Sequence, residues 1–302
     1  MNSFFLVATL LNWAVLQPNA QFWQFWSDGK AEIGFYKGTQ VRYGEVRPAK
    51  TFLIFVTEPF NAAKQVKADN PEQGNSAYNG VLKLNHVKRF QTGIYTYSLM
   101  TSVFTSVTPA TANSIPYNVG APLKITFSGQ EWCGMTFHQL NRQPDKSMKS
   151  RSNSYFESEG DREESLKADE NTLFADDAFI AVRELLRPLK TGSITYYPTL
   201  DHARISHKPL APEQATVSKK DATTRFRGAN VQTTEWTIAA QTGTWTFAVE
   251  QQYPRRILAF RYVEGGKVME EAELHESTRL PYWKLNGVKD EHYLFELDKT
   301  AK

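Results

Sequence analysis

Cysteine is almost absent from this chain: Cys133 is the only one among 302 residues. A single thiol cannot form an internal disulfide, so the fold must be held by packing and by the hydrogen bonds of its secondary structure. Sequence motifs that identify a particular reaction or cofactor are also lacking. For example, the acidic run over residues 157–170 does not contain the Asp-x-Asp-x-Asp-Gly pattern of a calcium-binding loop. We therefore expect no cofactor.

An excess of charge of one sign is also lacking. The chain has 35 lysines and arginines against 32 acidic residues, which leaves a net charge of +3. Lys83, Lys88 and Arg89, close to Phe90 and Tyr95, form a short basic and aromatic patch without the signature of an RNA-binding module. No nucleic-acid partner is expected from this balance.

Long apolar runs are missing beyond the N-terminus. Residues 4–16 form an uncharged apolar stretch that has the length of a signal-peptide core and is shorter than the roughly 20 residues that span a bilayer. We predict a signal peptide over residues 1–20, cleaved after Ala20, and an exported, periplasmic chain without a transmembrane anchor once the signal is removed. A buried N-terminal helix is the alternative.

After this segment, short runs of alternating apolar and polar residues dominate, rich in aromatics, valine and threonine. The pattern predicts a mainly β (α+β) fold, either one large curved antiparallel sheet or two β-rich halves, with one main helix. Strands are expected at 31–36, 52–58, 80–84, 95–107, 123–131, 135–141, 151–158, 193–199, 215–219, 234–240, 244–250, 256–264 and 267–275.

Turn signals and one helix organise the second half. Gln241–Gly243 and the pair Gly265 and Gly266 separate alternating runs and predict a C-terminal meander. The helix begins at Ala175 with two aspartates in its first turn and ends before Pro188. The acidic segment before it suggests a boundary near residue 170, between a β-rich half (21–170) and a half with the helix and meander (171–302). A single sheet is the alternative.

Seven segments together resemble an uncharacterised family of exported bacterial proteins: FWSDGKAE (25–32), RYGE (42–45), VTE (56–58), TGIY (92–95), QEWCG (130–134), SYFE (154–157) and SHKP (206–209). The resemblance implies export and carries no activity. Some members are labelled septum formation inhibitor, which implies a nucleotide pyrophosphatase of the Maf type. That enzyme's Ser-x-Ser-Pro-Arg-Arg phosphate-binding turn is not in this chain, so the label does not predict its activity here.

Cys133 is the one candidate nucleophile, in the segment 130–134. A cysteine hydrolase or transferase needs an oxyanion donor, an orienting carboxylate and a base. The residues available for these roles are Gln130, Glu131 and either His207 or His138. The alternative, which we favour, is that Cys133 is a small buried hydrophobic residue next to Trp132.

Two other polar groups have ordinary explanations. Glu131, Cys133 and His138 resemble part of a metal-ligand set, but alternation places His138 on the other face of a strand, so no metal site is predicted. The stretch around His207, residues 199–209, is expected to be a surface connection, although His207 is the preferred general base if there is one.

The tryptophans are the main candidates for contact with a ligand. Four aromatics lie within residues 22–26, and they are expected either to enter the core with the first strand or to form an exposed platform. The candidates for ligand contact are Trp23, Trp26, Trp132, Trp236 and Trp245. The leading hypothesis is a non-enzymatic cell-envelope protein that binds an apolar or lipid-like ligand or an envelope partner. The alternatives are the cysteine enzyme and a structural subunit of an envelope assembly.

Overall fold

The computed structural model describes residues 18–69, 78–108 and 117–293. Most of the predicted signal peptide, residues 1–17, lies outside this part of the chain. Within it, no helix is both long enough and apolar enough to cross a membrane.

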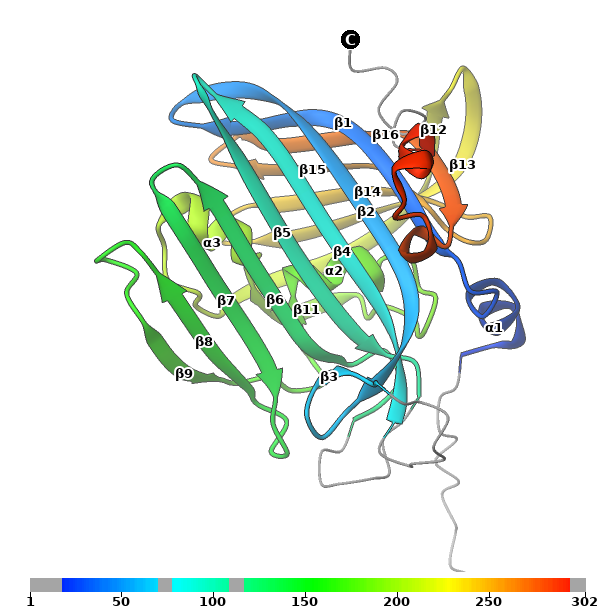
Figure 1. Cartoon of the computed structure of the whole chain (residues 1–302), viewed down its shortest axis with the longest axis horizontal. Coiled ribbons are helices and arrows are strands. Elements are labelled where there is room, and N and C mark those ends of the chain that lie inside the picture. Colours follow the sequence, from blue (N-terminus) through cyan, green and yellow to red (C-terminus); the bar gives the residue numbers. More distant parts are fainter. Residues whose placement is uncertain (1–17, 70–77, 109–116, 294–302) are drawn as a thin grey trace, which may run out of the picture.

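The described chain is mainly β, as predicted, and its strands form one large curved sheet (Figure 1). The strands are β1 (Ala31–Arg42), β2 (Glu45–Asn61), β3 (Val66–Lys67), β4 (Tyr78–Thr92), β5 (Tyr95–Ser106), β6 (Pro122–Glu131), β7 (Gly134–Arg142), β8 (Met148–Ser154), β9 (Arg162–Leu166), β10 (Thr172–Phe174), β11 (Gly192–Tyr197), β12 (Glu213–Phe226), β13 (Ala229–Ala240), β14 (Thr244–Glu250), β15 (Ile257–Glu264) and β16 (Lys267–Leu280).

The order of strands shows that the two halves of the chain share this sheet. It runs β10-β11-β12-β13-β14-β15-β16-β1-β2-β4-β5-β6-β7-β8-β9, with β3 added beside β2. Neighbours are antiparallel except β10 and β11, which are parallel. The predicted boundary near residue 170 separates the two edge strands, β9 and β10, while β1 and β16 join the halves at the centre of the sheet. The single-sheet alternative therefore describes the structure.

Two short helices fill the concave side of the sheet (Figure 1). These are α2 (Ala175–Ala181) and α3 (Leu200–Ser206). On α2, the ring of Phe179 packs edge-on against Trp245 and Phe247 of β14, with centroids 5.6 Å and 5.1 Å away. Since alternate residues of β14 point to this side, the period-2 pattern supplies a continuous apolar surface for the helices to cover.

The predicted main helix is present as α2, but it ends at Ala181 instead of continuing to Pro188. Besides α2 and α3 there is a helix α1 (Ala20–Trp26), and two 3₁₀ turns, η1 (Tyr282–Lys284) and η2 (Val288–Asp290), follow β16. Side-chain caps explain both missed helices. Asn19 accepts a hydrogen bond from the N–H of Phe22 at 2.9 Å, and Thr199 accepts one from His202 at 3.2 Å. The aromatic segment 22–26 is thus helical instead of entering a strand.

A buried arginine fixes the end of α2. Arg183 is fully buried, and its guanidinium lies 2.8 Å from the carboxylate of Glu32 on β1. It also donates to the carbonyl oxygens of Pro254 and Arg255, at 2.8 Å and 3.0 Å, and lies over the ring of Phe55. The hydrogen bonds and the ion pair of Arg183 are all made inside the protein, so this residue links α2 to β1, to β2 and to the turn before β15.

We predict that Arg183→Met lowers the free energy of unfolding by about 3–5 kcal/mol, because Glu32 would remain buried without its partner. The double variant Arg183→Met/Glu32→Gln should recover part of this loss, since the orphaned charge is removed. Urea denaturation measures both.

The matched control is Lys220→Met, which breaks an ion pair with Glu235 in which the lysine is 70% exposed. It should cost less than about 1 kcal/mol. A loss from Arg183→Met no larger than this would show that the buried pair does not hold α2.

Candidate functional site

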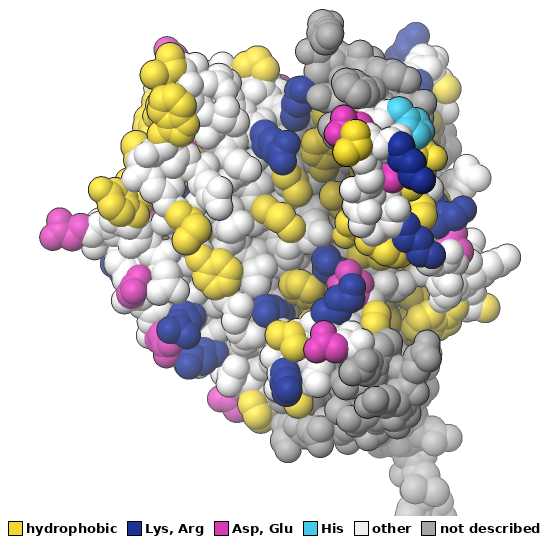
Figure 2. Space-filling model, in the orientation of Figure 1, with side chains coloured by type: hydrophobic (Ala, Val, Ile, Leu, Met, Phe, Trp, Pro, Cys, Tyr) yellow, Lys and Arg dark blue, Asp and Glu magenta, His cyan; other side chains and the backbone are white. Residues whose placement is uncertain are grey.

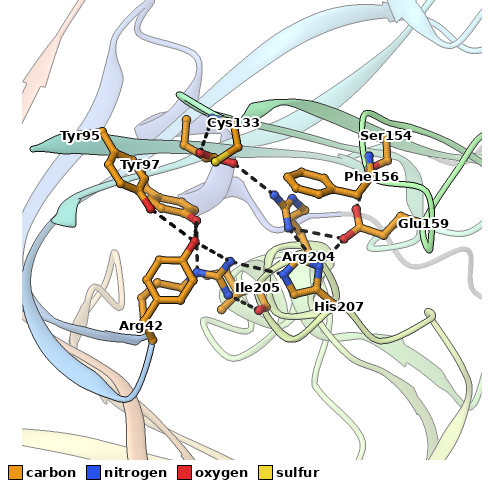
Figure 3. A network of polar contacts seen from close by, with 12 residues as sticks. Arg42, Tyr95, Tyr97, Cys133, Ser154, Phe156, Glu159, Arg204, Ile205 and His207 are labelled. Carbon is orange, nitrogen blue, oxygen red and sulfur yellow. Dashed lines mark hydrogen bonds and ion pairs between the residues drawn. The ribbon is translucent and has the colours of Figure 1, made fainter. Parts of the chain in front are cut away.

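Side chains from several separate elements meet at one end of the concave face, which we call the rim network (Figure 3). They come from the hairpin tips of β1–β2, β4–β5 and β6–β7, from the loop between β8 and β9, and from the C-terminal end of α3. The network comprises Arg42, Tyr43, Tyr95, Tyr97, Glu131, Cys133, Ser154, Phe156, Glu159, Arg204, Ile205 and His207.

His207 ends α3 in a left-handed conformation, with φ of 56°, and its ring is held on both sides. Its Nδ1 atom lies 2.7 Å from Oε1 of Glu159, and its Nε2 atom lies 3.4 Å from the guanidinium of Arg42. The predicted surface connection is thus an ordered helix end. The carboxylate of Glu159 orients the imidazole.

Two arginines that sequence reasoning did not single out hold α3 against the sheet. Arg204 is buried, lies 3.6 Å from Glu131 and 3.4 Å from Glu159, and its guanidinium covers the ring of Phe156 at 4.2 Å. Arg42 donates to the carbonyl oxygen of Ile205 at 2.5 Å. Their partners lie on other elements, so no local pattern in the sequence pointed to them.

The prediction that Cys133 is buried is wrong. Trp132 and Cys133 form the tip of the β6–β7 hairpin, between the paired residues Glu131 and Gly134, and both are exposed. A hairpin tip that projects beyond the sheet has no second layer to cover it. Glu131 accepts a hydrogen bond from the backbone N–H of Cys133 at 2.7 Å, and a further hydrogen bond from the thiol to this carboxylate raises the pKa of Cys133.

The predicted catalytic residues are only partly brought together. Glu131, Cys133 and His207 belong to the rim network, but Arg204 lies between the cysteine and the histidine (Figure 3). Gln130 is exposed beside the tip. A nucleophilic cysteine needs a lowered pKa and an adjacent base. Here the pKa of Cys133 is raised, mainly by its hydrogen bond to Glu131, and His207 is not adjacent to the thiol.

His138 is placed elsewhere, in the middle of β7. Its Nε2 atom lies 2.8 Å from the hydroxyl of Ser150, and burial lowers its pKa to about 4. It shares a cavity of about 290 Å³ with His207, Glu159 and Arg204, and Cys133 does not line this cavity. Among the described residues, no group of His, Cys, Asp and Glu side chains is arranged to hold a metal ion.

The five candidate tryptophans do not share one surface. Trp26, Trp236 and Trp245 are buried in the core, whereas Trp23 and Trp132 are exposed. Trp132, 73% exposed, stacks on Tyr95 with ring centroids 6.0 Å apart. A single platform built from all five is therefore not formed.

Exposed apolar side chains instead gather at the hairpin tips. Figure 2 shows hydrophobic side chains along the upper left edge of the molecule, where the β1–β2 and β4–β5 tips lie in Figure 1. The exposed apolar residues in and beside the tips include Tyr43, Val46, Ile94, Trp132, Met135 and Tyr155. Each comes from a turn or strand end that the sheet cannot cover.

A second cavity, which we call the α2 cavity, has an apolar lining. It measures about 180 Å³ and lies between α2, the turn after it and β10–β11. Its apolar walls are Leu173, Ile180, Ala181, Leu185, Leu186, Pro188, Leu189 and Ile194. The carboxyl of Asp177 also lines it and accepts a hydrogen bond from Thr105 at 2.6 Å, and burial raises the pKa of Asp177 to about 6.

Comparison of the chain with protein-family models, with curated proteins and with solved structures found no match in any of the three. The resemblance to an uncharacterised exported family therefore stays a prediction.

We predict that Cys133 reacts with a maleimide in the folded protein, since it is exposed, and that its rate rises at a more alkaline pH than that of an ordinary thiol of pKa about 8.5. Glu131→Gln should move this midpoint to lower pH because it removes the negative charge beside the thiol. Mass spectrometry of the labelled fraction against time and pH gives the midpoint.

Glu159→Gln is the control, because Glu159 belongs to the rim network and contacts Arg204 and His207. It should leave the midpoint unchanged. A wild-type midpoint below about pH 7 would mean a thiolate at neutral pH and would restore the nucleophile hypothesis.

Asp177 should make the protein more stable on mild acidification. Its folded pKa of about 6 lies above the unfolded value of 3.8, so the folded state takes up the proton first as the pH falls. Wild type should therefore gain on the order of 2–3 kcal/mol, relative to Asp177→Asn, between about pH 7 and pH 4. Denaturation curves of both proteins at each pH give this difference, and a constant difference would contradict the assignment.

Proposed function

We propose that this protein is a non-enzymatic binding protein of the cell envelope that takes an apolar or lipid-like ligand into the α2 cavity. The observation that carries the proposal is the apolar lining of a cavity of about 180 Å³. Cavities of similar size with apolar walls bind small hydrocarbons, because water inside them finds no hydrogen-bond partners. The volume suits a short chain or a single ring.

The mouth of the cavity favours an amphiphile. Pro188 and Lys190 line it and are exposed, so a ligand has access from solvent on this side. The guanidinium of Arg187 and the ammonium of Lys190 are the cationic groups of the lining, while Glu170 and Asp177 are the acidic ones. An apolar chain inside the cavity, with a carboxylate beside Lys190, matches this division.

Export is the part of the proposal that depends on the leader. Residues 18–20 are described and lie at the start of α1, where Asn19 provides the cap. Cleavage after Ala20 would remove this cap from the helix. The N-terminal mass of the protein isolated from its own cells distinguishes a mature chain that begins at Gln21 from an uncleaved one.

The alternatives rest on other observations. The cysteine-dependent hydrolase has little geometric support, because the carboxylate of Glu131 raises the pKa of Cys133 and Arg204 lies between the thiol and His207. The hypotheses of an envelope partner and of a structural subunit are supported by the exposed apolar side chains at the hairpin tips. These hypotheses do not exclude a ligand in the α2 cavity.

We predict that the protein binds octanoate, and that Ala181→Phe weakens this binding at least tenfold by filling the α2 cavity. Lys190→Ala should weaken octanoate binding while leaving the affinity for 1-octanol unchanged, because only the carboxylate loses a partner. Isothermal titration calorimetry measures both ligands.

Ala229→Phe introduces the same ring at an exposed alanine of β13 and should bind octanoate as the wild type does. Thermal unfolding of each variant shows whether it has folded. Unchanged octanoate binding by a folded Ala181→Phe variant would place the ligand elsewhere and contradict the proposal.

A further inference from the structure

A buried charge cluster lies behind α3 and is not used by the rim network. The ammonium of Lys88 on β4 lies 2.6 Å from Oδ2 of Asp201, 2.7 Å from Oε2 of Glu270 and 2.8 Å from Oε1 of Gln40. The lysine side chain is 2% exposed. These three contacts use all three of its donor hydrogens.

One oxygen of this cluster is left without a partner. Oε1 of Glu270 is buried and makes no hydrogen bond, although the other oxygen of the same carboxylate is bound to Lys88. The side chain of Glu270 is only 8% exposed, so water does not solvate it freely. A buried acceptor without a hydrogen-bond partner is destabilising, and more so when the group is charged. A ligand that donates to this oxygen would remove this destabilisation.

The cluster opens onto a cavity of about 160 Å³ that is separate from the α2 cavity. Aromatic rings form part of its wall: Trp245 and Tyr262 have centroids 4.9 Å apart. The remaining wall includes Tyr43 and Gly44 of the β1–β2 tip, and both are exposed. The cavity therefore connects the buried carboxylate with solvent.

More acidic than basic residues line this cavity, although Glu264 also pairs with Lys208 at 3.1 Å. Asp201, Glu264 and Glu270 are acidic, whereas Lys88 and Arg42 are the basic residues. Arg42 is already bound to the carbonyl oxygen of Ile205 and the hydroxyl of Tyr97, and Lys88 has no donor left. Burial lowers the pKa of His202, which therefore adds no positive charge at neutral pH. An anion finds no free donor among these cations.

We propose that this cavity binds a small organic cation, with an ammonium or guanidinium group donating to Oε1 of Glu270 and its apolar part against Trp245 and Tyr262. The cation would give Oε1 of Glu270 the hydrogen-bond donor that it lacks, and the ligand's apolar part would be in contact with the two rings. The volume limits the ligand to a few heavy atoms beyond the charged group. This inference is independent of the ligand proposed for the α2 cavity.

The test is titration of the full chain with ethylammonium and with guanidinium, and with 1-propanol as an uncharged ligand of similar size, by calorimetry. We expect binding of at least one cation and none of 1-propanol. Glu270→Gln should weaken cation binding at least tenfold, which corresponds to about 1.4 kcal/mol.

Glu271→Gln is the matched control, because Glu271 is the next residue of β16 and pairs with Arg261 outside the cavity. It should bind the cation as the wild type does. If Glu270→Gln does not fold, Ser206→Leu tests the same cavity, since it fills the space beside α3 and leaves the Lys88 cluster intact.

Absence of cation binding by the wild type would overturn the proposal, and so would equal binding of 1-propanol. Equal weakening by Glu270→Gln and Glu271→Gln would show a nonspecific effect of charge and would also overturn it. Cation binding that a folded Ser206→Leu variant retains would place the site elsewhere. Selective loss in Glu270→Gln, or in Ser206→Leu, supports it.

Discussion

The position of α3 depends on the contact between Lys88 and Asp201. Lys88 lies on β4, its second carboxylate partner, Glu270, lies on β16, and Asp201 is the only one of the three on a helix. Removing charges from water costs several kcal/mol per ion, so the cluster is stable only when all its members are in place. Once Asp201 is held, Arg204 and His207 are brought to the hairpin tips. The rim network is thus a consequence of a contact buried behind it.

The second helix of the interior follows the same principle. A seven-residue helix such as α2 is too short to be stable by itself, and tertiary contacts must hold it. Apolar packing of Phe179 supplies part of the stabilisation, and the ion pair of Arg183 with Glu32 fixes the orientation of the helix. Apolar contacts tolerate sliding, whereas a buried charge pair has one geometry. Both helices therefore occupy defined positions on the sheet. The apolar surface of the sheet alone would not fix these positions.

The sequence predicted most of the strands, because period-2 alternation reports directly which face of a strand is buried, but not the short strands β3, β9 and β10. In β14, Trp245, Phe247 and Val249 alternate with less buried neighbours, as expected. Polar residues carry no such signal. From the sequence alone, Lys88 belongs to a basic patch and Asp201 to a surface connection, because their partners lie far away in the chain. The exposed position of Cys133 follows from a tip of only two residues, which alternation does not reveal.

Some polar groups of the protein are already bound to one another, whereas others lack a partner and are available to a ligand. In the rim network, the carboxylate of Glu159 already contacts the side chains of Arg204 and His207, so it has little capacity for an additional partner. The interior differs: the α2 cavity has an apolar lining, and Oε1 of Glu270 has no hydrogen-bond partner. Because α2 and α3 form walls of these cavities, a ligand in either would also stabilise the docking of a helix. Binding and the stability of the interior are therefore linked through the same two short helices.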